Sequence, residues 1–237
     1  MNKNNMIGAF PQLFKTTVII PALNPPKSFV ELVKTLKAGG LQKIIVVNDG
    51  SAKEYQNTFD TILSLGATVL KHPINRGQGA AIKTGMAYVS QNHLDAIGVI
   101  TADADGQHTA KDIINIAKLQ QDNPGTIILG IRRINFFKLP LRNFIGNFVA
   151  KTIFRLLTKK KVKDTQCGLR AVPISLIPGL LSLSGQQFEY ATQMLVYLTK
   201  SGLNMIQVPI ETIYAKHIHS HFKPINDSIS IIRALLE

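Results

Sequence analysis

The chain has 237 residues, 45% of them apolar, and 27 lysines and arginines against 14 acidic residues give a formal net charge of +13. This length fits one large α/β domain, which can bury enough surface to fold without a disulfide. The single Cys167 cannot form an intramolecular disulfide, and the N-terminus lacks a secretory pattern, so we expect a reducing, cytoplasmic location. No apolar run reaches the length of a membrane span, and the positive charge favours an anionic partner: nucleic acid, a membrane surface or a phosphorylated molecule.

Apolar segments and amphipathic segments alternate along the first half of the chain. Runs that end in turn-forming residues predict strands over 16–20, 43–47, 67–70, 95–101 and 126–129. Helical periodicity predicts helices over 28–37, up to about residue 65, over 78–91 and over 111–121. The alternation is typical of βαβ units, so we expect an α/β fold with a Rossmann-like, mostly parallel sheet and helices on both faces.

The segment 97–108, IGVITADADGQH, runs from an apolar strand directly into Asp103, Asp105 and Gln107. A strand that ends in Asp-x-Asp delivers two carboxylates to the carboxyl edge of the sheet, where open α/β folds bind ligands. Oxygen ligands of this kind suit Mg²⁺ or Mn²⁺ shared with substrate phosphates. An isolated Asp-x-Asp is more often an ordinary turn, so the neighbouring loops must decide between the two interpretations.

Polar residues also follow the other predicted strands, at 21–26, 48–51 and 72–79. Because parallel strands end at one edge, we expect these loops to converge there with the Asp-x-Asp loop. Asp49 can accept hydrogen bonds from a base or ribose. Gly77 follows Arg76 at a helix entry, where backbone amides and the guanidinium can approach a phosphate. The glycines alone could equally serve only a tight helix entry.

Several motifs occur in order: IPALN at 20–24, VVNDGS at 46–51, NRGQGAAIKTG at 75–85 and TADADGQH at 101–108. This series resembles glycosyltransferase family 2, the inverting enzymes of GT-A fold. DTQCGLRAV at 164–172, FEYATQML at 188–195, VPIETIY at 208–214 and SHFKPINDS at 220–228 are similar to the branch that makes polyprenyl-phosphate sugars, such as the dolichyl-phosphate mannose synthases and bactoprenol glucosyltransferases. The resemblance spans residues 16–232 and implies one GT-A catalytic domain over 1–237. Its nucleotide-sugar half would cover about 14–131, and its acceptor and membrane-facing half about 132–237.

The resemblance also implies roles for individual residues. The nucleotide sugar is expected at Pro21, Ala22, Asn24, Asp49, Asn75, Arg76, Gly77, Ala102 and Asp103. The Mg²⁺ or Mn²⁺ ion is expected at Asp103, Asp105 and Gln107, and the acceptor phosphate at Arg132, Arg142 and Lys223. Asp105 and Arg142 are the expected catalytic residues. Two prolines follow Asn24 where most relatives carry an acidic residue, so the choice of base between UDP and GDP stays open.

The function that the resemblance implies is metal-dependent, inverting transfer of a hexose from a UDP- or GDP-sugar to a polyprenyl phosphate. A lipid phosphate is already an anion, so cations that position it would suffice. Transfer to a non-lipid hydroxyl acceptor is one alternative, and it would give Asp164 or Glu189 a role as general base. The other alternative, a basic nucleic-acid-binding module, is disfavoured because aromatic residues are not interleaved with basic ones, and we expect no nucleic-acid partner.

The segment 139–163 combines a wide apolar face with lysines at 159–161 and 163. This pattern is typical of a helix that lies in a membrane interface, although a core-facing helix with a solvated lysine tail would look similar. We expect peripheral contact with an anionic membrane on its cytoplasmic side, made directly or through a C-terminal anchor that follows Glu237.

Overall fold

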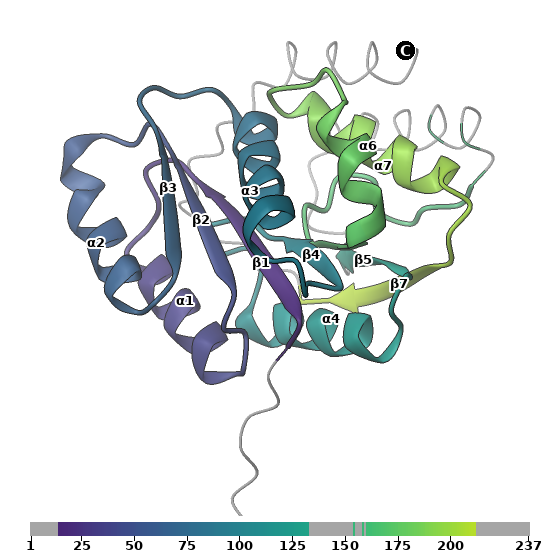
Figure 1. Cartoon of the computed structure of the whole chain (residues 1–237), viewed down its shortest axis with the longest axis horizontal. Coiled ribbons are helices and arrows are strands. Elements are labelled where there is room, and N and C mark those ends of the chain that lie inside the picture. The colour runs from purple at the N-terminus through teal and green to yellow at the C-terminus, as the bar shows by residue number, and fades with distance from the viewer. Residues whose placement is uncertain (1–13, 133–153, 155–157, 159, 212–237) are drawn as a thin grey trace, which may run out of the picture.

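The computed structural model describes residues 14–132, 154, 158 and 160–211 (Figure 1). Its strands are β1 (Thr16–Ala22), β2 (Ile44–Asp49), β3 (Thr68–His72), β4 (Gly98–Thr101), β5 (Ile127–Arg132), β6 (Arg170–Pro173) and β7 (Met205–Ile210). Its helices are α1 (Ser28–Ala38), α2 (Gln56–Ser64), α3 (Gln78–Asn92), α4 (Ala110–Asp122), α6 (Ile177–Leu181) and α7 (Glu189–Lys200), with short 3₁₀ turns η1 (Lys53–Tyr55) and η3 (Ile174–Leu176). Arg142, Lys223 and most of the segment 139–163 lie outside the described residues.

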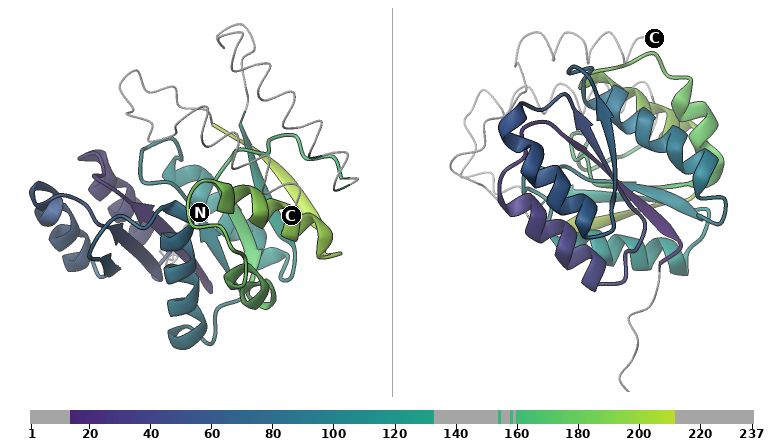
Figure 2. Two further views of the ribbon diagram at one scale, coloured as in Figure 1. Left: turned by 90° about the horizontal axis from the view of Figure 1, so that it is seen from above. Right: turned by 60° about the vertical axis from the view of Figure 1, so that its left-hand side comes forward.

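The described strands form one seven-stranded sheet in the order β3-β2-β1-β4-β6-β5-β7, covered by helices on both faces (Figures 1 and 2). Phe29 of α1 and Ile62 of α2 pack with Val46 on one face. Ile45, the neighbour of Val46, packs with Met86 of α3 on the other face. Because both faces are covered, β2 is buried along its whole length and its sequence is continuously apolar up to its last two residues. The expected α/β class with a mostly parallel sheet is confirmed.

No strand was predicted at β6, which is antiparallel to its two neighbours β4 and β5. Arg170 at the start of β6 is paired with Thr101 at the end of β4. An antiparallel strand begins where its parallel neighbours end, so the residues before Arg170 reach the carboxyl edge of the sheet. The motif at 164–168 is thereby placed beside the Asp-x-Asp loop, although 59 residues separate Cys167 from His108.

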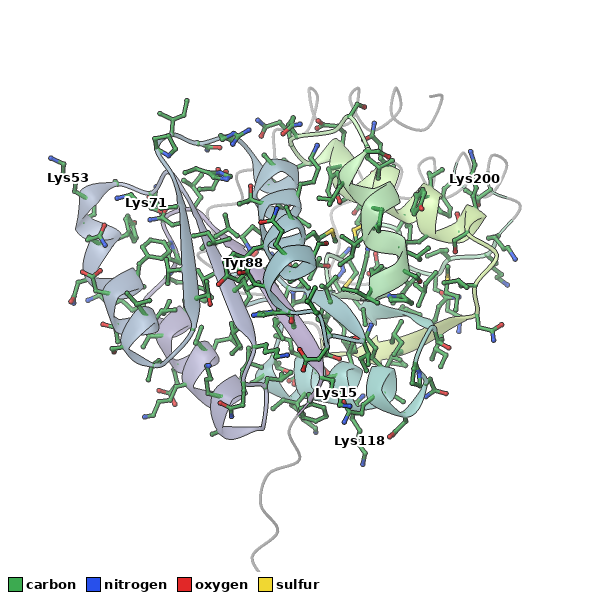
Figure 3. The ribbon with its side chains drawn as sticks, in the orientation of Figure 1. Lys15, Lys53, Lys71, Tyr88, Lys118 and Lys200 are labelled. Atoms are coloured by element: carbon green, nitrogen blue, oxygen red, sulfur yellow. The ribbon has the colours of Figure 1, made fainter. Side chains whose placement is uncertain are left out.

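The predicted strand over 95–101 begins only at Gly98. Asp95 forms an ion pair with Lys43 at the surface, and the N–H of Ala96 donates to the carbonyl of His93, so the chain turns before the strand starts. Other predicted elements of the first half agree with the structure to within a few residues. No helix among the described residues is long and apolar enough to cross a bilayer. Among the described residues, Lys53, Lys118 and Lys200 project outward from η1, α4 and α7 on different sides of the molecule (Figure 3).

Candidate active site

The loops that follow β1 and β2 are tied together by Asn24. Its backbone adopts a positive φ of 49°, a conformation that asparagine tolerates better than most residues. The N–H of Asn24 donates to Oγ of Ser51 at 2.9 Å, and its Oδ1 accepts from the N–H of Ala52 at 3.0 Å. Pro21 and Ala22 lie at the end of β1, with Ala22 buried. These residues lie together at the carboxyl edge of the sheet.

Asp49 joins the β2 loop to the loop that follows β3. Its Oδ1 accepts from Nδ1 of His72 at 2.6 Å and from the N–H of Arg76 at 2.9 Å, and its Oδ2 accepts from the N–H of Gly77 at 2.8 Å. The Asp49 carboxylate is almost completely buried, with 5% of the side chain exposed. The predicted contact between Asp49 and the base stays a prediction, and the carboxylate shown here holds the entry of α3 in place.

The N-terminus of α3 faces the same edge. Gly77, its N-cap residue, has a φ of 100°, and a Cβ there would lie 2.4 Å from the side chain of Gln187, so a larger residue does not fit. The Oδ1 of Asn75 also accepts from the N–H of Gly77. The carbonyl of Gln186 accepts from the N–H of Ala80, one of the N–H groups that have no partner within the first turn of the helix. The Arg76 side chain is exposed beside this helix terminus.

The Asp-x-Asp turn follows β4, and Ala102 at its start is buried. Oδ1 of Asp103 accepts from Nε2 of Gln78 at 2.8 Å, which joins the turn to α3. Asp105 accepts from both nitrogens of Gln107: the backbone N–H at 2.9 Å and the amide Nε2 at 2.6 Å. Gly106 between them has a φ of 85°, which a β-carbon would strain. The convergence of the four loops on one edge is therefore confirmed.

Electrostatics indicate that this turn suits a cation. Burial raises the pKa of Asp105, and the neighbouring charge of Asp103 raises it further. Within the described chain, no three histidine, cysteine or acidic side chains gather as a metal site. At this turn a cation would therefore have to use the carboxylates of Asp103 and Asp105 together with the amide of Gln107. Mg²⁺ commonly uses one or two carboxylates and takes its other ligands from water and substrate phosphates. The donor set at Asp103, Asp105 and Gln107 fits that requirement.

Arg132, at the end of β5, forms a bidentate ion pair with Asp164. Nε donates to Oδ2 at 2.8 Å and Nη2 donates to Oδ1 at 3.0 Å. Burial opposes ionisation of Asp164, but the hydrogen bonds and the charge of Arg132 outweigh it and hold the pKa of this carboxyl below its ordinary value. The predicted contact of Arg132 with the acceptor phosphate stays a prediction.

Glu189 and Arg170 stabilise the segments that flank the site. Oε1 of Glu189 accepts from the N–H groups of Gln186 and Gln187, which shapes the loop that covers the start of α3. Arg170 is buried, and its guanidinium donates to the carbonyls of Cys167, Thr165 and Ala191. Burial lowers the pKa of Arg170.

Sequence reasoning assigned no role to His72, Gln78, His108 or Arg170. Each of them hydrogen-bonds a residue at or beside the site. The last three stand inside motifs that carried the resemblance, and His72 ends β3 opposite Asp49 in the parallel register. The sequence did contain a signal for His72. It is a polar residue that follows the end of one predicted strand, and Asp49 follows the end of the neighbouring predicted strand.

The sheet order and the helices on both faces define the fold class of the chain as GT-A. The structure of glucosyl-3-phosphoglycerate synthase from Mycobacterium tuberculosis, in complex with Mn²⁺, uridine diphosphate and phosphoglyceric acid, matches with a TM-score of 0.70. The match covers 94% of this chain and 78% of that chain at 18% identity, so it shows a shared fold. The expected GT-A fold is confirmed.

The family model described as glycosyl transferase family 2 matches residues 17–175, and the chain belongs to this family. The UDP-N-acetylglucosamine–dolichyl-phosphate N-acetylglucosaminyltransferase of Methanococcus voltae is 31% identical over 221 residues, which cover 84% of this chain and 86% of the relative. The dolichyl-phosphate beta-glucosyltransferase of Trichomonas vaginalis is 27% identical over 235 residues, which cover 85% of this chain and 68% of the relative. The protein is a glycosyltransferase, and the predicted resemblance to the polyprenyl-phosphate branch is confirmed.

Proposed function

We propose that the protein is a metal-dependent, inverting glycosyltransferase that moves a hexose from a UDP- or GDP-sugar to a polyprenyl phosphate. The observation that carries this proposal is the half-buried turn after β4, in which Asp103 accepts a hydrogen bond from Gln78 and Asp105 accepts two from Gln107. Two such carboxylates at the carboxyl edge of an α/β sheet favour a divalent cation and a phosphorylated ligand. The names of the two relatives supply the acceptor class, and the Mn²⁺ and UDP in the structural neighbour support the donor side.

The donor would lie across the loops that follow β1 to β4. Asp103, Asp105 and Gln107 are the residues we propose for Mg²⁺ or Mn²⁺, which when bound would neutralise the charge that builds on the leaving diphosphate. Arg76 and the start of α3 would face that diphosphate, since a helix N-terminus favours anions. The nucleoside would contact residues of the neighbouring loops: Pro21, Ala22, Asn24, Asp49, Asn75, Gly77 and Ala102.

In the proposed reaction, an oxygen of the acceptor phosphate attacks C1 of the sugar on the face opposite the diphosphate. The new C1–O bond forms as the bond between C1 and the diphosphate oxygen breaks, and the configuration inverts. The attacking oxygen is already an anion at neutral pH, so no side chain needs to take a proton. The cations proposed to position it are Arg132, Arg142 and Lys223, of which the last two lie outside the described residues.

Of the two candidate bases of the alternative function, Asp164 is poorly suited to serve a hydroxyl acceptor, which favours a phosphate acceptor. A hydroxyl must lose a proton as it attacks, which requires a general base with a free carboxylate oxygen near neutral pKa. Asp164 is buried in its ion pair with Arg132 and its pKa is lowered, so it is a weak base. The Oε1 atom of Glu189 already accepts two backbone N–H groups.

The proposal also divides the chain as the motifs suggested, within one GT-A catalytic domain over 1–237. Residues of about 14–131 would bind the nucleotide sugar, and residues of about 132–237 would meet the acceptor and the membrane. Lys160, Lys161 and Lys163 are exposed at the described end of the basic segment, in keeping with peripheral contact with an anionic membrane at its cytoplasmic face.

The test is a donor and acceptor panel with the purified chain. UDP- and GDP-hexoses are combined with Mg²⁺ or Mn²⁺ and with undecaprenyl phosphate or a soluble glycoside, and lipid-linked sugar is measured. We expect transfer to the lipid phosphate only with a divalent cation, and a loss of at least about 100-fold in Asp105→Ala without loss of thermal stability. Asp95→Ala, which removes an exposed carboxylate outside the site, is the matched control and should keep full activity. Full activity of Asp105→Ala, or transfer without any divalent cation, contradicts the proposal.

A further inference from the structure

His108 closes the Asp-x-Asp turn from inside the protein. The residue is 4% exposed and precedes Thr109, whose hydroxyl caps helix α4. Its ring Nδ1 accepts a hydrogen bond from the backbone N–H of Asp103 at 3.0 Å. The backbone N–H of Asp103 is partly buried, and such a group needs an acceptor because leaving it unpaired costs free energy. The imidazole therefore fixes the main chain at the first residue of the turn.

The partners of His108 define its chemical form. The N–H of Asp103 is a donor, so Nδ1 must carry a lone pair and the proton of the neutral ring lies on Nε2. Nε2 faces Sγ of Cys167 at 3.9 Å, a weak sulfur acceptor. Burial raises the pKa of the Cys167 thiol to about 12, so this sulfur stays protonated at neutral pH. The ring thus links the Asp-x-Asp turn to the turn at 164–168.

The side chain of Asp103 is held independently of its main chain. Gln78 donates to its Oδ1 at 2.8 Å, whereas Oδ2 lies 3.7 Å from Nδ1 of His108. Gly168 packs directly against this carboxylate. Because Asp105 follows in the same turn, a shift of the Asp103 main chain would move both carboxylates that we propose as cation ligands.

We propose that His108 is a positioning residue: its Nδ1, as a neutral acceptor, fixes the Asp103–Asp105 turn in the arrangement that binds the divalent cation. The inference rests on the proposed metal-dependent function and names a residue beyond the ligands. His108 acts through the backbone of Asp103 and does not touch the cation or the substrate.

Two substitutions separate the ring nitrogens. In His108→Asn, the side-chain amide oxygen can take the place of Nδ1 and still accept from Asp103. In His108→Gln, the longer side chain carries its amide to the place of Nε2 and leaves that N–H without an acceptor. Mn²⁺ binding to the full chain is measured directly by titration calorimetry, and KM for Mn²⁺ and kcat are measured in the transfer assay, with thermal unfolding as the control for folding.

We expect His108→Asn to bind Mn²⁺ within about 3-fold of the wild type and His108→Gln to bind it about 10-fold more weakly, because a partly buried donor left unpaired shifts an equilibrium by about that factor. The loss should appear in KM for Mn²⁺ more than in kcat at saturating Mn²⁺. Equal binding by both variants overturns the inference, and so does an equal loss in both. Failure of the wild-type chain to bind Mn²⁺ would instead overturn the proposed function itself.

A measurement on the unmodified protein guards against a variant that does not fold. The ¹⁵N chemical shifts of the His108 ring distinguish the Nε2–H tautomer from the Nδ1–H tautomer. We expect the Nε2–H form, whereas a proton on Nδ1 would rule out the bond from Asp103 and refute the inference.

Discussion

The ion pair of Asp164 and Arg132 makes a quantitative prediction for Asp164→Asn. The Asp164 carboxylate receives two charged hydrogen bonds from the guanidinium and two more from the N–H groups of Arg132 and Gln166. Its side chain is 2% exposed, whereas that of Arg132 is 25% exposed. Removing one partner of a buried pair costs about 3–5 kcal/mol, and the partial exposure of Arg132 places this case near 3 kcal/mol. For a chain of this length that corresponds to a fall in Tm of about 6–12 °C.

Thermal unfolding followed by circular dichroism measures this change, and the matched control is Asp95→Asn. Asp95 pairs with Lys43 at the surface, where ion pairs contribute little, so the control should unfold near the wild-type temperature. The Asp164 effect also depends on pH. Its folded pKa is lowered, so its contribution is complete above the unfolded value of about 4 and is lost as the pH falls through the folded pKa. The Tm values of the wild type and of Asp164→Asn, plotted against pH, should therefore converge in acid. An unchanged Tm at neutral pH together with abolished turnover would refute this reasoning and make Asp164 a catalytic base.

Two further predictions concern the edge of the sheet. In Gly168→Ala, the new Cβ would lie 2.7 Å from Oδ2 of Asp103, so the carboxylate must move; we expect donor turnover at limiting Mn²⁺ to fall by about 10- to 100-fold with thermal unfolding little changed. Wild-type kinetics would mean that this carboxylate needs no fixed position. In Asp49→Asn, an amide nitrogen replaces one acceptor oxygen, so one of the donors from His72, Arg76 or Gly77 loses its partner. We expect the free energy of unfolding, measured with denaturant, to fall by about 1–3 kcal/mol. Unchanged stability together with weaker binding of the sugar nucleotide would contradict this expectation and indicate that Asp49 acts only by contacting the base.

The sequence predicted the regular first half of the fold well because its signals are local. A buried parallel strand such as β2 is apolar throughout, and a turn former such as Gly50 follows it immediately. Strand β6 lacked such a signal, since it has only four residues and its place between β4 and β5 is set by pairing with distant segments. Local pattern cannot reveal which strands will become its neighbours.

The candidate site divides in the same way. The Asp-x-Asp turn was found because its residues are adjacent in the chain and follow a strand. The ion pair between Arg132 and Asp164 was not found, because Asp164 lies 32 residues away. Its position beside Arg132 depends on β6, a strand that the sequence pattern did not predict. His108 lay within a recognised motif, but its function depends on a bond to a main-chain N–H, and the motif letters carry no information about that bond.

The strand order has a consequence for how the protein is made. Strand β5 ends near the boundary between the two halves, yet among the described strands it pairs only with β6 and β7, which emerge from the ribosome later. Until then β5 has no neighbour in the sheet, and its apolar residues such as Ile128 remain without their partner strands. Pairing across such sequence distances slows folding. A fragment that stops after the first half should therefore be prone to aggregation, and the growing chain should become a stable unit only after synthesis has passed β7.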